Sequence, residues 1–258
     1  MTSHFAPHTP PKRADELLVA QGVVESRAIA QRIIKSGQAF RADGSTIAKP
    51  STKIPADEPL TITAPPRFVS QGGEKLESWF DAHPLDFSGL AALDVGASTG
   101  GFTDCLLQRG AAHVTGIDVG HGQLHPRLLD DERVTNIEGL NAKDLDEAEL
   151  PHEVYPIVVA DLSFISLKKV IEPIWNRVAP GGTAILLVKP QFEAPKEVIS
   201  KTKGILRDDA LRAETLAGVI AEATALPGCK IIGQIECPVA GGDGNREYLL
   251  GLSKSDIH

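Results

Sequence analysis

Short apolar segments alternate with longer amphipathic segments from Leu90 to the C-terminus, and this alternation restricts the fold more than any other feature of the chain. It is typical of a parallel β-sheet covered by helices on both faces. We predict strands over residues 91–95, 113–117, 134–138, 157–160, 183–188, 230–236 and 247–252. We predict helices over residues 74–82, 102–108, 167–178 and 209–226, with Pro180-Gly181-Gly182 as the stop before the fifth strand.

The last predicted strand follows a glycine-rich connection that is too short for a crossover helix. Short connections imply antiparallel pairing, so this strand begins at the edge where the parallel strands end. The predicted fold class is therefore α/β, with a seven-stranded mixed sheet whose last strand is antiparallel.

A smaller module precedes the sheet, as the length of 258 residues also suggests. Residues 1–11 hold three prolines and no periodic pattern, which predicts a flexible tail. Residues 12–64 predict a small α+β domain with two short helices, the second capped by Ser26 and ended by Gly37. We expect a linker at 65–72, where Pro65 and Pro66 interrupt regular structure, and the large domain at 73–255.

The net charge of −8 is unevenly distributed. Residues 1–70 hold nine basic and six acidic residues, and the rest of the chain holds 17 basic and 28 acidic residues. A basic module on an acidic body suits a protein that binds a polyanion at one end, although ordinary scatter would also explain the difference.

Composition excludes several other classes of protein. No apolar run approaches the roughly 20 residues of a membrane span, and the N-terminus lacks an apolar signal segment. Cys105, Cys229 and Cys237 form no metal-binding motif and fit reduced thiols. We therefore expect a cytoplasmic protein without a bound metal.

A turn of small residues connects the first predicted strand of the sheet to a helix. It contains Gly96, Ala97, Ser98, Thr99, Gly100, Gly101 and Phe102. Such a turn lets the backbone approach a ligand, and Asp118 ends the next strand at the distance where a carboxylate accepts ribose hydroxyls. The alternative is a tight turn beside an exposed aspartate, because Ser98 interrupts the dinucleotide fingerprint.

Three charged residues lie at neighbouring strand ends. Asp161 follows one predicted strand, Lys189 follows the next, and Glu247 begins the antiparallel one. Ligands bind at this edge of open α/β sheets, so we expect the three side chains at one site. Taken singly, Lys189 also fits a surface lysine, and Glu247 fits an ordinary charge at a strand edge.

These motifs, with others along nearly the whole chain, resemble the TlyA family, whose members join an S4-type RNA-binding domain to an FtsJ/RrmJ-like methyltransferase. The resemblance rests on the S4-like run 13–62, Val69-Ser70-Gln71-Gly72-Gly73-Glu74-Lys75-Leu76, Asp94-Val95-Gly96-Ala97-Ser98-Thr99-Gly100-Gly101-Phe102, Asp118-Val119-Gly120-His121-Gly122, Asp161-Leu162-Ser163-Phe164, Lys189-Pro190-Gln191-Phe192-Glu193, Lys203-Gly204-Ile205-Leu206-Arg207-Asp208 and Gly244-Asn245-Arg246-Glu247-Tyr248. Family members methylate ribose 2′-hydroxyls of ribosomal RNA and are often called hemolysins.

The resemblance implies a class I Rossmann-like methyltransferase that uses S-adenosylmethionine to methylate a ribose, that of a cytidine, in ribosomal RNA or ribosomal subunits. The implied catalytic tetrad is Lys75, Asp161, Lys189 and Glu247. The implied cofactor-binding residues are Gly96, Ala97, Ser98, Thr99, Gly100, Gly101, Phe102, Asp118, Asn141 and Asp161, and the implied RNA-binding residues are Arg13, Arg27, Arg32, Lys35 and Arg67.

Within this tetrad, Lys189 is the candidate for the base or for the charge that stabilises the developing alkoxide, and the acids orient the two lysines. A charged Lys75 nearby would favour a neutral Lys189 and Asp161 would oppose it, so the sequence leaves the balance open. Two departures from the family bear on RNA contacts: Gln71 replaces an arginine, and Gly242-Asp243-Gly244 replaces a more basic loop.

Three other functions compete with this one. A catalytically inactive ribosome-associated factor would not need the tetrad, and a membrane-active hemolysin would need a cationic amphipathic helix, whereas residues 211–226 hold Arg212 as their only basic residue. A dinucleotide-dependent oxidoreductase would bind NAD in place of S-adenosylmethionine. The sequence does not identify the target nucleotide, the ribosomal subunit or the oligomeric state.

Overall fold

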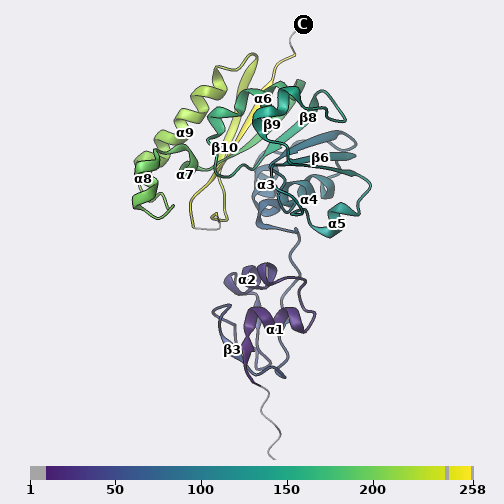
Figure 1. The fold of residues 1–258 in the computed structure, drawn as a ribbon, viewed down its shortest axis with the longest axis vertical. Coiled ribbons are helices and arrows are strands. Elements are labelled where there is room, and N and C mark those ends of the chain that lie inside the picture. Colours follow the sequence, from purple (N-terminus) through teal and green to yellow (C-terminus); the bar gives the residue numbers. More distant parts are fainter. Residues whose placement is uncertain (1–9, 242–243, 257–258) are drawn as a thin grey trace, which may run out of the picture. The chain divides into compact units, whose positions relative to one another are not determined.

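The computed structural model describes residues 10–241 and 244–256 and divides into two compact units, Met1–Arg67 and Phe68–His258, which we call the N-terminal and C-terminal units (Figure 1). Most of the predicted tail, residues 1–9, lies outside the described residues. Gly242 and Asp243 of the loop that departs from the family also lie outside them.

The N-terminal unit packs two helices against two small antiparallel sheets. Its elements are β1 (Lys12–Arg13), α1 (Ala14–Ala20), α2 (Arg27–Lys35), β2 (Ala39–Phe40), β3 (Lys53–Ile54) and β4 (Thr61–Ile62), with β1 paired to β3 and β2 to β4. The Oγ of Ser26 accepts a hydrogen bond from the backbone N–H of Ile29, and Gly37 follows the helix at a φ of +73°. The predicted start and stop of α2 are therefore confirmed.

The C-terminal unit contains the large sheet. Its strands are β5 (Ala91–Val95), β6 (His113–Asp118), β7 (Val134–Glu138), β8 (Tyr155–Ala160), β9 (Val178–Val188), β10 (Cys229–Glu236) and β11 (Tyr248–Lys254). Its helices are α3 (Gln71–Ala82), α4 (Gly101–Gln108), α5 (Pro126–Leu129), α6 (Ile171–Asn176), α7 (Pro190–Glu193), α8 (Lys196–Lys201) and α9 (Asp209–Thr224), with short 3₁₀ turns η1 (Ala142–Glu147) and η2 (Leu167–Lys169).

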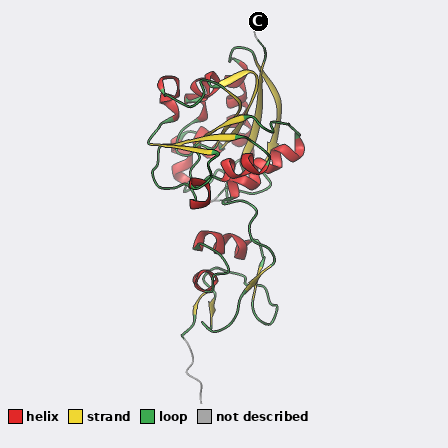
Figure 2. Ribbon diagram, turned by 90° about the vertical axis from the view of Figure 1, so that its right-hand side faces the viewer, coloured by secondary structure: helices red, strands yellow, loops and turns green. Residues whose placement is uncertain are grey.

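The strand order is β10-β11-β9-β8-β5-β6-β7, and β11 runs antiparallel to both of its neighbours while the other paired strands are parallel. The predicted fold class is confirmed. Helices cover both faces of this sheet (Figure 2). One apolar cluster joins the sheet to α3, α4 and α5, and another joins it to α6, α9 and η1.

Two predicted boundaries in the middle of the sheet are wrong. The helix expected over 167–178 is divided into η2 and α6, because Val170 leaves the helical region with a φ of −131°. The fifth strand begins at Val178 and not at Thr183. Tyr155 pairs with Val178 and Ile157 pairs with Thr183, so the Pro-Gly-Gly run forms a bulge within the strand and does not precede it.

The predicted linker is too long, and three helices, α5, α7 and α8, were not predicted. Phe68 is buried in the core of the C-terminal unit and α3 begins at Gln71, so the chain enters this unit before Gly73. A Cβ on Gly73 would lie 2.3 Å from the Phe68 ring, so Gly73 permits close packing and does not mark a loop. Helices α5 and α7 are only four residues long and α8 buries no residue, so none of the three has a clear apolar period.

Candidate active site

The C-terminal unit has a pocket at the carboxyl ends of its parallel strands. Its lining includes Gly96, Ser98, Asp118, Asn141, Asp161, Lys189 and Glu247. The cavity volume is about 1610 Å³. This volume exceeds that of a typical pocket for one small ligand, so a cofactor and part of a second substrate can share it.

The turn after β5 is fixed to the end of β6. The backbone N–H groups of Gly96 and Ala97 donate to the carbonyl oxygen of Ile117, at 2.8 and 3.0 Å. The Asp118 carboxylate accepts hydrogen bonds from the backbone N–H of Ser98 (2.8 Å) and of Gly120 (2.7 Å). A carboxylate has about four acceptor positions, so Asp118 retains capacity for hydroxyl groups.

The small residues of this turn serve different purposes. Gly96 and Ser98 line the pocket, whereas Ala97, Thr99, Gly100, Gly101 and Phe102 are not among its described lining residues. A Cβ on Gly100 would meet Leu128 at 2.2 Å, and one on Gly101 would meet Ser70 at 2.2 Å, so these glycines allow close packing. Phe102 is 3% exposed in the apolar core. Phe102 therefore packs within the core, where it does not line the pocket as a cofactor-binding residue would.

Asn141 also lines this pocket, although it follows the turn by about 40 residues in the sequence. It caps η1, and its Oδ1 accepts a hydrogen bond from the backbone N–H of Lys143 at 3.1 Å. The side-chain amide still has two N–H groups that it can offer to a ligand.

Two ion pairs contain the four residues of the predicted tetrad. Lys189 Nζ lies 2.5 Å from Asp161 Oδ1 and donates to Ser163 Oγ at 2.9 Å. Lys75 Nζ lies 2.5 Å from Glu247 Oε2, and both of these side chains are buried. Each acid holds one lysine, as the sequence analysis expected.

The two pairs differ in their access to the pocket. Lys189 and Asp161 line it, as does Glu247, but Lys75 is not among the described lining residues. Glu247 immediately precedes β11, whose Tyr248 pairs with Val188 of β9, and this register places it beside the strand end that carries Lys189. Lys189 is thus the tetrad lysine that can reach a substrate, and Lys75 fixes Glu247.

Three polar residues at this site were missed by the sequence analysis. Ser163 contacts Lys189, Gln191 Nε2 donates to Glu247 Oε1 at 3.4 Å, and Glu193 accepts from the Oγ of Ser166 and the backbone N–H of Leu167 at 2.6 and 2.5 Å. All three belong to the quoted motifs that follow β8 and β9. Their position after a strand end was the available signal.

Asp94 lies in β5 directly before the turn and is fully buried. Its Oδ2 accepts a hydrogen bond from Thr103 Oγ1 at 2.7 Å, whereas Oδ1 has no partner. Burial raises the pKa of this carboxyl to about 7, because the charged form loses its water. Asp94 is a further titratable group beside the pocket.

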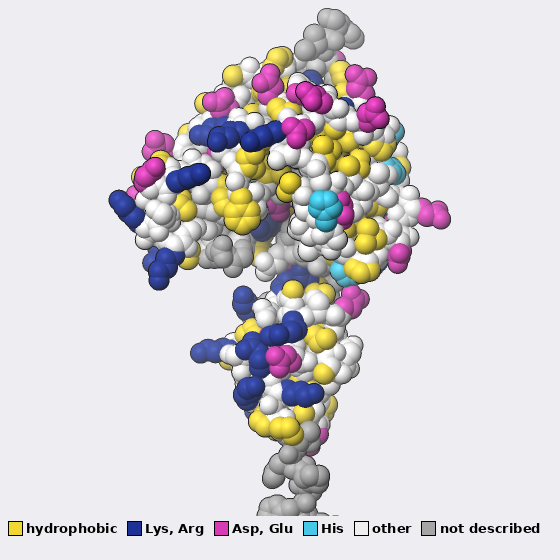
Figure 3. Space-filling view, viewed as in Figure 1, with side chains coloured by type: hydrophobic (Ala, Val, Ile, Leu, Met, Phe, Trp, Pro, Cys, Tyr) yellow, Lys and Arg dark blue, Asp and Glu magenta, His cyan; other side chains and the backbone are white. Residues whose placement is uncertain are grey.

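The predicted RNA-binding residues belong to the N-terminal unit, where Lys and Arg side chains gather on the visible face (Figure 3). The buried Asp15 carboxylate accepts hydrogen bonds from Arg13 at 2.9 and 3.0 Å, from Arg27 at 3.1 Å and from Gln31 at 2.8 Å. These donors hold the pKa of Asp15 well below its usual range. Two of the expected arginines, Arg13 and Arg27, are therefore both held by the Asp15 carboxylate.

The other expected residues lie at two places. Arg32 and Lys35 occupy the last turn of α2, and Arg67 is the last residue of the N-terminal unit. Lys35 and Arg67 are exposed.

No group of three or more His, Cys, Asp or Glu side chains among the described residues could hold a metal ion. No helix in the described part of the chain is long and apolar enough to cross a membrane.

Comparison with known proteins relates this site to a family. The sequence model of the FtsJ-like methyltransferase family matches residues 68–254. Hemolysin A of Brachyspira hyodysenteriae is 39% identical over 92% of this chain and 98% of that protein. The 16S/23S rRNA (cytidine-2′-O)-methyltransferase TlyA of Mycobacterium tuberculosis is 39% identical over 93% of this chain and 89% of its own length. A solved structure named as a hemolysin of Streptococcus thermophilus has 35% identity and a TM-score of 0.72, covering 96% of this chain and 90% of that chain.

Proposed function

This chain belongs to the FtsJ-like methyltransferase family, and we propose that it transfers a methyl group from S-adenosylmethionine to a ribose 2′-hydroxyl of ribosomal RNA. The observation that carries the proposal is the Lys189–Asp161 ion pair in the same pocket as Asp118 and the turn after β5. A proton-accepting or charge-stabilising group thus shares one cavity with a cofactor-binding turn. The relative from Mycobacterium tuberculosis supports cytidine as the target nucleoside.

The residues around the turn fit this cofactor. Asp118 can accept hydrogen bonds from the two ribose hydroxyls, and Asn141 can donate to a ring nitrogen of the adenine. Ile117, Val119 and Leu140 supply an apolar lining for a base. When bound, S-adenosylmethionine supplies a methyl group that its sulfonium makes electrophilic.

Lys189 acts on the substrate hydroxyl. Its amine has three tetrahedral positions besides the side-chain bond, and Asp161 and Ser163 occupy two of them. The third position makes no hydrogen bond or ion pair with a described residue, and it can accept the proton of the 2′-hydroxyl or donate to the developing alkoxide. Lys75 and Glu247 keep the neighbouring wall of the pocket in place.

The N-terminal unit binds the RNA in this proposal, as an S4-like domain. Arg13 and Arg27 form ion pairs with Asp15, and Lys35 is exposed at the end of α2. Basic side chains at this density suit contacts with phosphates, which position an RNA without reading its sequence.

The experiment that tests the function is methyl transfer to ribosomal RNA. The full chain is incubated with tritiated S-adenosylmethionine and purified small or large ribosomal subunits, and the RNA is digested to nucleosides for mass spectrometry. We expect label in 2′-O-methylcytidine, and the Lys189→Ala variant serves as the inactive control. Label on a base, or no label with either subunit, would contradict the proposal.

A further inference from the structure

The cations of the C-terminal unit fall into two groups. Most are engaged within the unit: Arg109, Arg127, Arg133, Arg212 and Arg246 form ion pairs, Arg177 and Lys254 donate to backbone carbonyls, and Lys75 and Lys189 belong to the two site pairs. An acidic unit can satisfy its cations internally, because 28 acids are available for 17 basic residues from residue 71 onward.

Eight cations do not follow this pattern and make no ion pair or side-chain hydrogen bond with a described residue. Five of them lie close together in sequence and structure, and we call them the lysine rim: Lys168, Lys169, Lys196, Lys201 and Lys203. All five are exposed. The other three are Lys143, Arg207 and Lys230.

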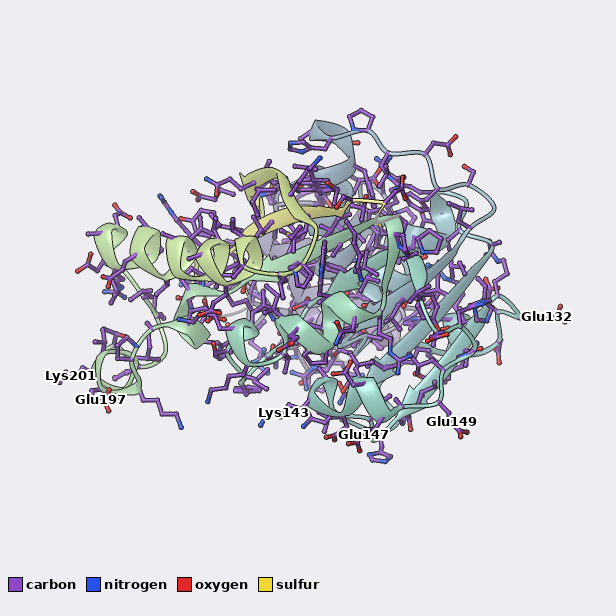
Figure 4. All side chains as sticks on the ribbon, turned by 90° about the horizontal axis from the view of Figure 1, so that it is seen from above. Glu132, Lys143, Glu147, Glu149, Glu197 and Lys201 are labelled. Atoms are coloured by element: carbon purple, nitrogen blue, oxygen red, sulfur yellow. The ribbon has the colours of Figure 1, made fainter. Side chains whose placement is uncertain are left out.

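The lysine rim lies at the pocket. Lys168 and Lys169 of η2 and Lys196 of α8 line the pocket directly. Lys201 ends α8, and Lys203 precedes Gly204, another lining residue. Lys and Arg side chains are visible over α8 in Figure 3, and Figure 4 shows Lys201 extending outward at the end of this helix.

Acids near the rim do not neutralise it. The pocket acids Asp161, Glu193 and Glu247 are already hydrogen-bonded or ion-paired. Glu222 of α9 lines the pocket, and Glu197 of α8 is exposed beside Lys201, but neither forms an ion pair with the rim. By contrast, Lys143 of η1, which also lines the pocket, has Asp144, Asp146 and Glu147 as neighbours in the same 3₁₀ turn.

Helix α8 also receives little stabilisation from packing against the rest of the C-terminal unit. None of its residues is buried, although it carries two rim lysines and lines the pocket with Lys196, Ile199 and Ser200. A helix of this length is marginal without packing, so a bound partner would stabilise it.

We propose that the lysine rim binds phosphates of the RNA strand whose nucleotide enters the pocket, and that it forms a second RNA-binding surface besides the N-terminal unit. The inference rests on the proposed function, because it places RNA over the pocket that holds Lys189. Lysines without fixed partners suit a phosphate backbone, which presents repeated negative charges and demands no planar geometry. An anionic lipid surface is the competing polyanion.

The test measures how RNA binding by the full chain depends on salt. The variants are Lys168→Gln/Lys169→Gln, Lys196→Gln/Lys201→Gln and the combination of all four. A short fluorescein-labelled oligocytidylate and purified ribosomal subunits serve as probes. For single-stranded RNA each phosphate contact adds about 0.7 to the slope of log K against log salt, so the fourfold variant should lower this slope by about 3.

Two controls keep the result specific. Lys230→Gln removes an equally exposed, unpaired lysine on β10 and should leave the slope unchanged. Thermal unfolding and S-adenosylhomocysteine affinity report whether the rim variants remain folded.

The outcomes separate the rim from the enzyme activity. Equal slopes for the fourfold variant and the parent would overturn the proposal, as would a loss of binding to phosphatidylglycerol vesicles with RNA binding unchanged. If the parent transfers no methyl group but the rim variants still lose RNA affinity, the proposed function fails and the lysine rim stands.

Discussion

Lys189 is the residue through which the proposed chemistry acts. Its replacement by alanine removes the only tetrad amine that lines the pocket, so methyl transfer should fall by at least about 100-fold, as is typical for a positioned acid–base group. Affinity for S-adenosylhomocysteine should change little, because Asp118 and the turn after β5 are intact. The rate is measured as tritiated methyl transferred to ribosomal subunits, and affinity by calorimetry.

Lys189→Arg separates the two roles of this residue. Arginine keeps the positive charge but does not give up its proton near neutral pH. Substantial activity in this variant would indicate electrostatic stabilisation, and near-normal turnover in the alanine variant would remove Lys189 from the site altogether.

Asp118→Ala should weaken binding of S-adenosylmethionine by roughly 10- to 100-fold, the value of about one or two hydrogen bonds to a charged group. The same change frees the backbone N–H groups of Ser98 and Gly120, which stabilise the turn. Calorimetric titration gives the affinity, and a thermal unfolding scan without ligand shows whether the turn has collapsed. An unchanged affinity would remove Asp118 from the cofactor site.

Asp94 should make the stability of the protein depend on pH. Its pKa is about 7 in the folded chain, against an ordinary value of 3.8. Between these values the folded state keeps a proton that the unfolded state releases, so this group's contribution to stability is complete below pH 3.8 and is lost as the pH rises to about 7.

The variant Asp94→Asn cannot ionise and retains an acceptor for Thr103. Its melting temperature relative to the parent should rise with pH across this window and stay constant above it. Calorimetric melting of both proteins over a pH series measures this difference. A difference that does not change with pH would show that Asp94 does not titrate in the folded protein.

At the scale of elements, Glu193 connects the segment after β9 to the segment after β8 through hydrogen bonds. It lies at the end of α7, after Lys189, and holds the start of η2 through Ser166 and Leu167. The loop between β8 and η2 carries Asp161 and Ser163, and it places Phe164 at a φ of +65°, where this residue is 92% exposed. Such a backbone conformation persists only when the surrounding structure holds it.

Glu193→Ala should therefore release this loop and lower the methylation rate by about 10- to 100-fold, with little effect on cofactor affinity. Glu193→Gln keeps an acceptor of the same size and should restore part of the rate. The ratio of these two rates under saturating cofactor is the measurement. Equal, parent-like rates for both variants would mean that the loop is fixed by other contacts.

At the scale of the whole molecule, each unit has its own apolar core. Residues 14–62 supply one cluster, and the two clusters of the C-terminal unit lie within residues 68–252. A fragment of residues 68–258 should thus unfold cooperatively and bind S-adenosylhomocysteine as the full chain does. Its affinity for ribosomal subunits should fall by at least about tenfold, because the arginines of the N-terminal unit are lost. Undiminished RNA affinity would show that the N-terminal unit is not the main RNA contact.

The sequence by itself determined the order of the seven strands of the large sheet along the chain and the edge of the sheet that holds the site. The period of its apolar residues distinguishes strands from helices, and a short connection requires the last strand to be antiparallel. Asp161, Lys189 and Glu247 could be placed at one edge on this basis. The family motifs then added Lys75, which lies in another segment of the chain.

Only the tertiary structure decided which side chains meet and which are merely packed. It paired Lys75 with Glu247 and Lys189 with Asp161, assigned Gly100, Gly101 and Phe102 to the interior, and brought Glu193 to Ser166. It also placed η2 and α8 at the same pocket, although α8 buries no residue. Local patterns record how each segment is buried, whereas contacts between distant segments depend on how the segments pack in space.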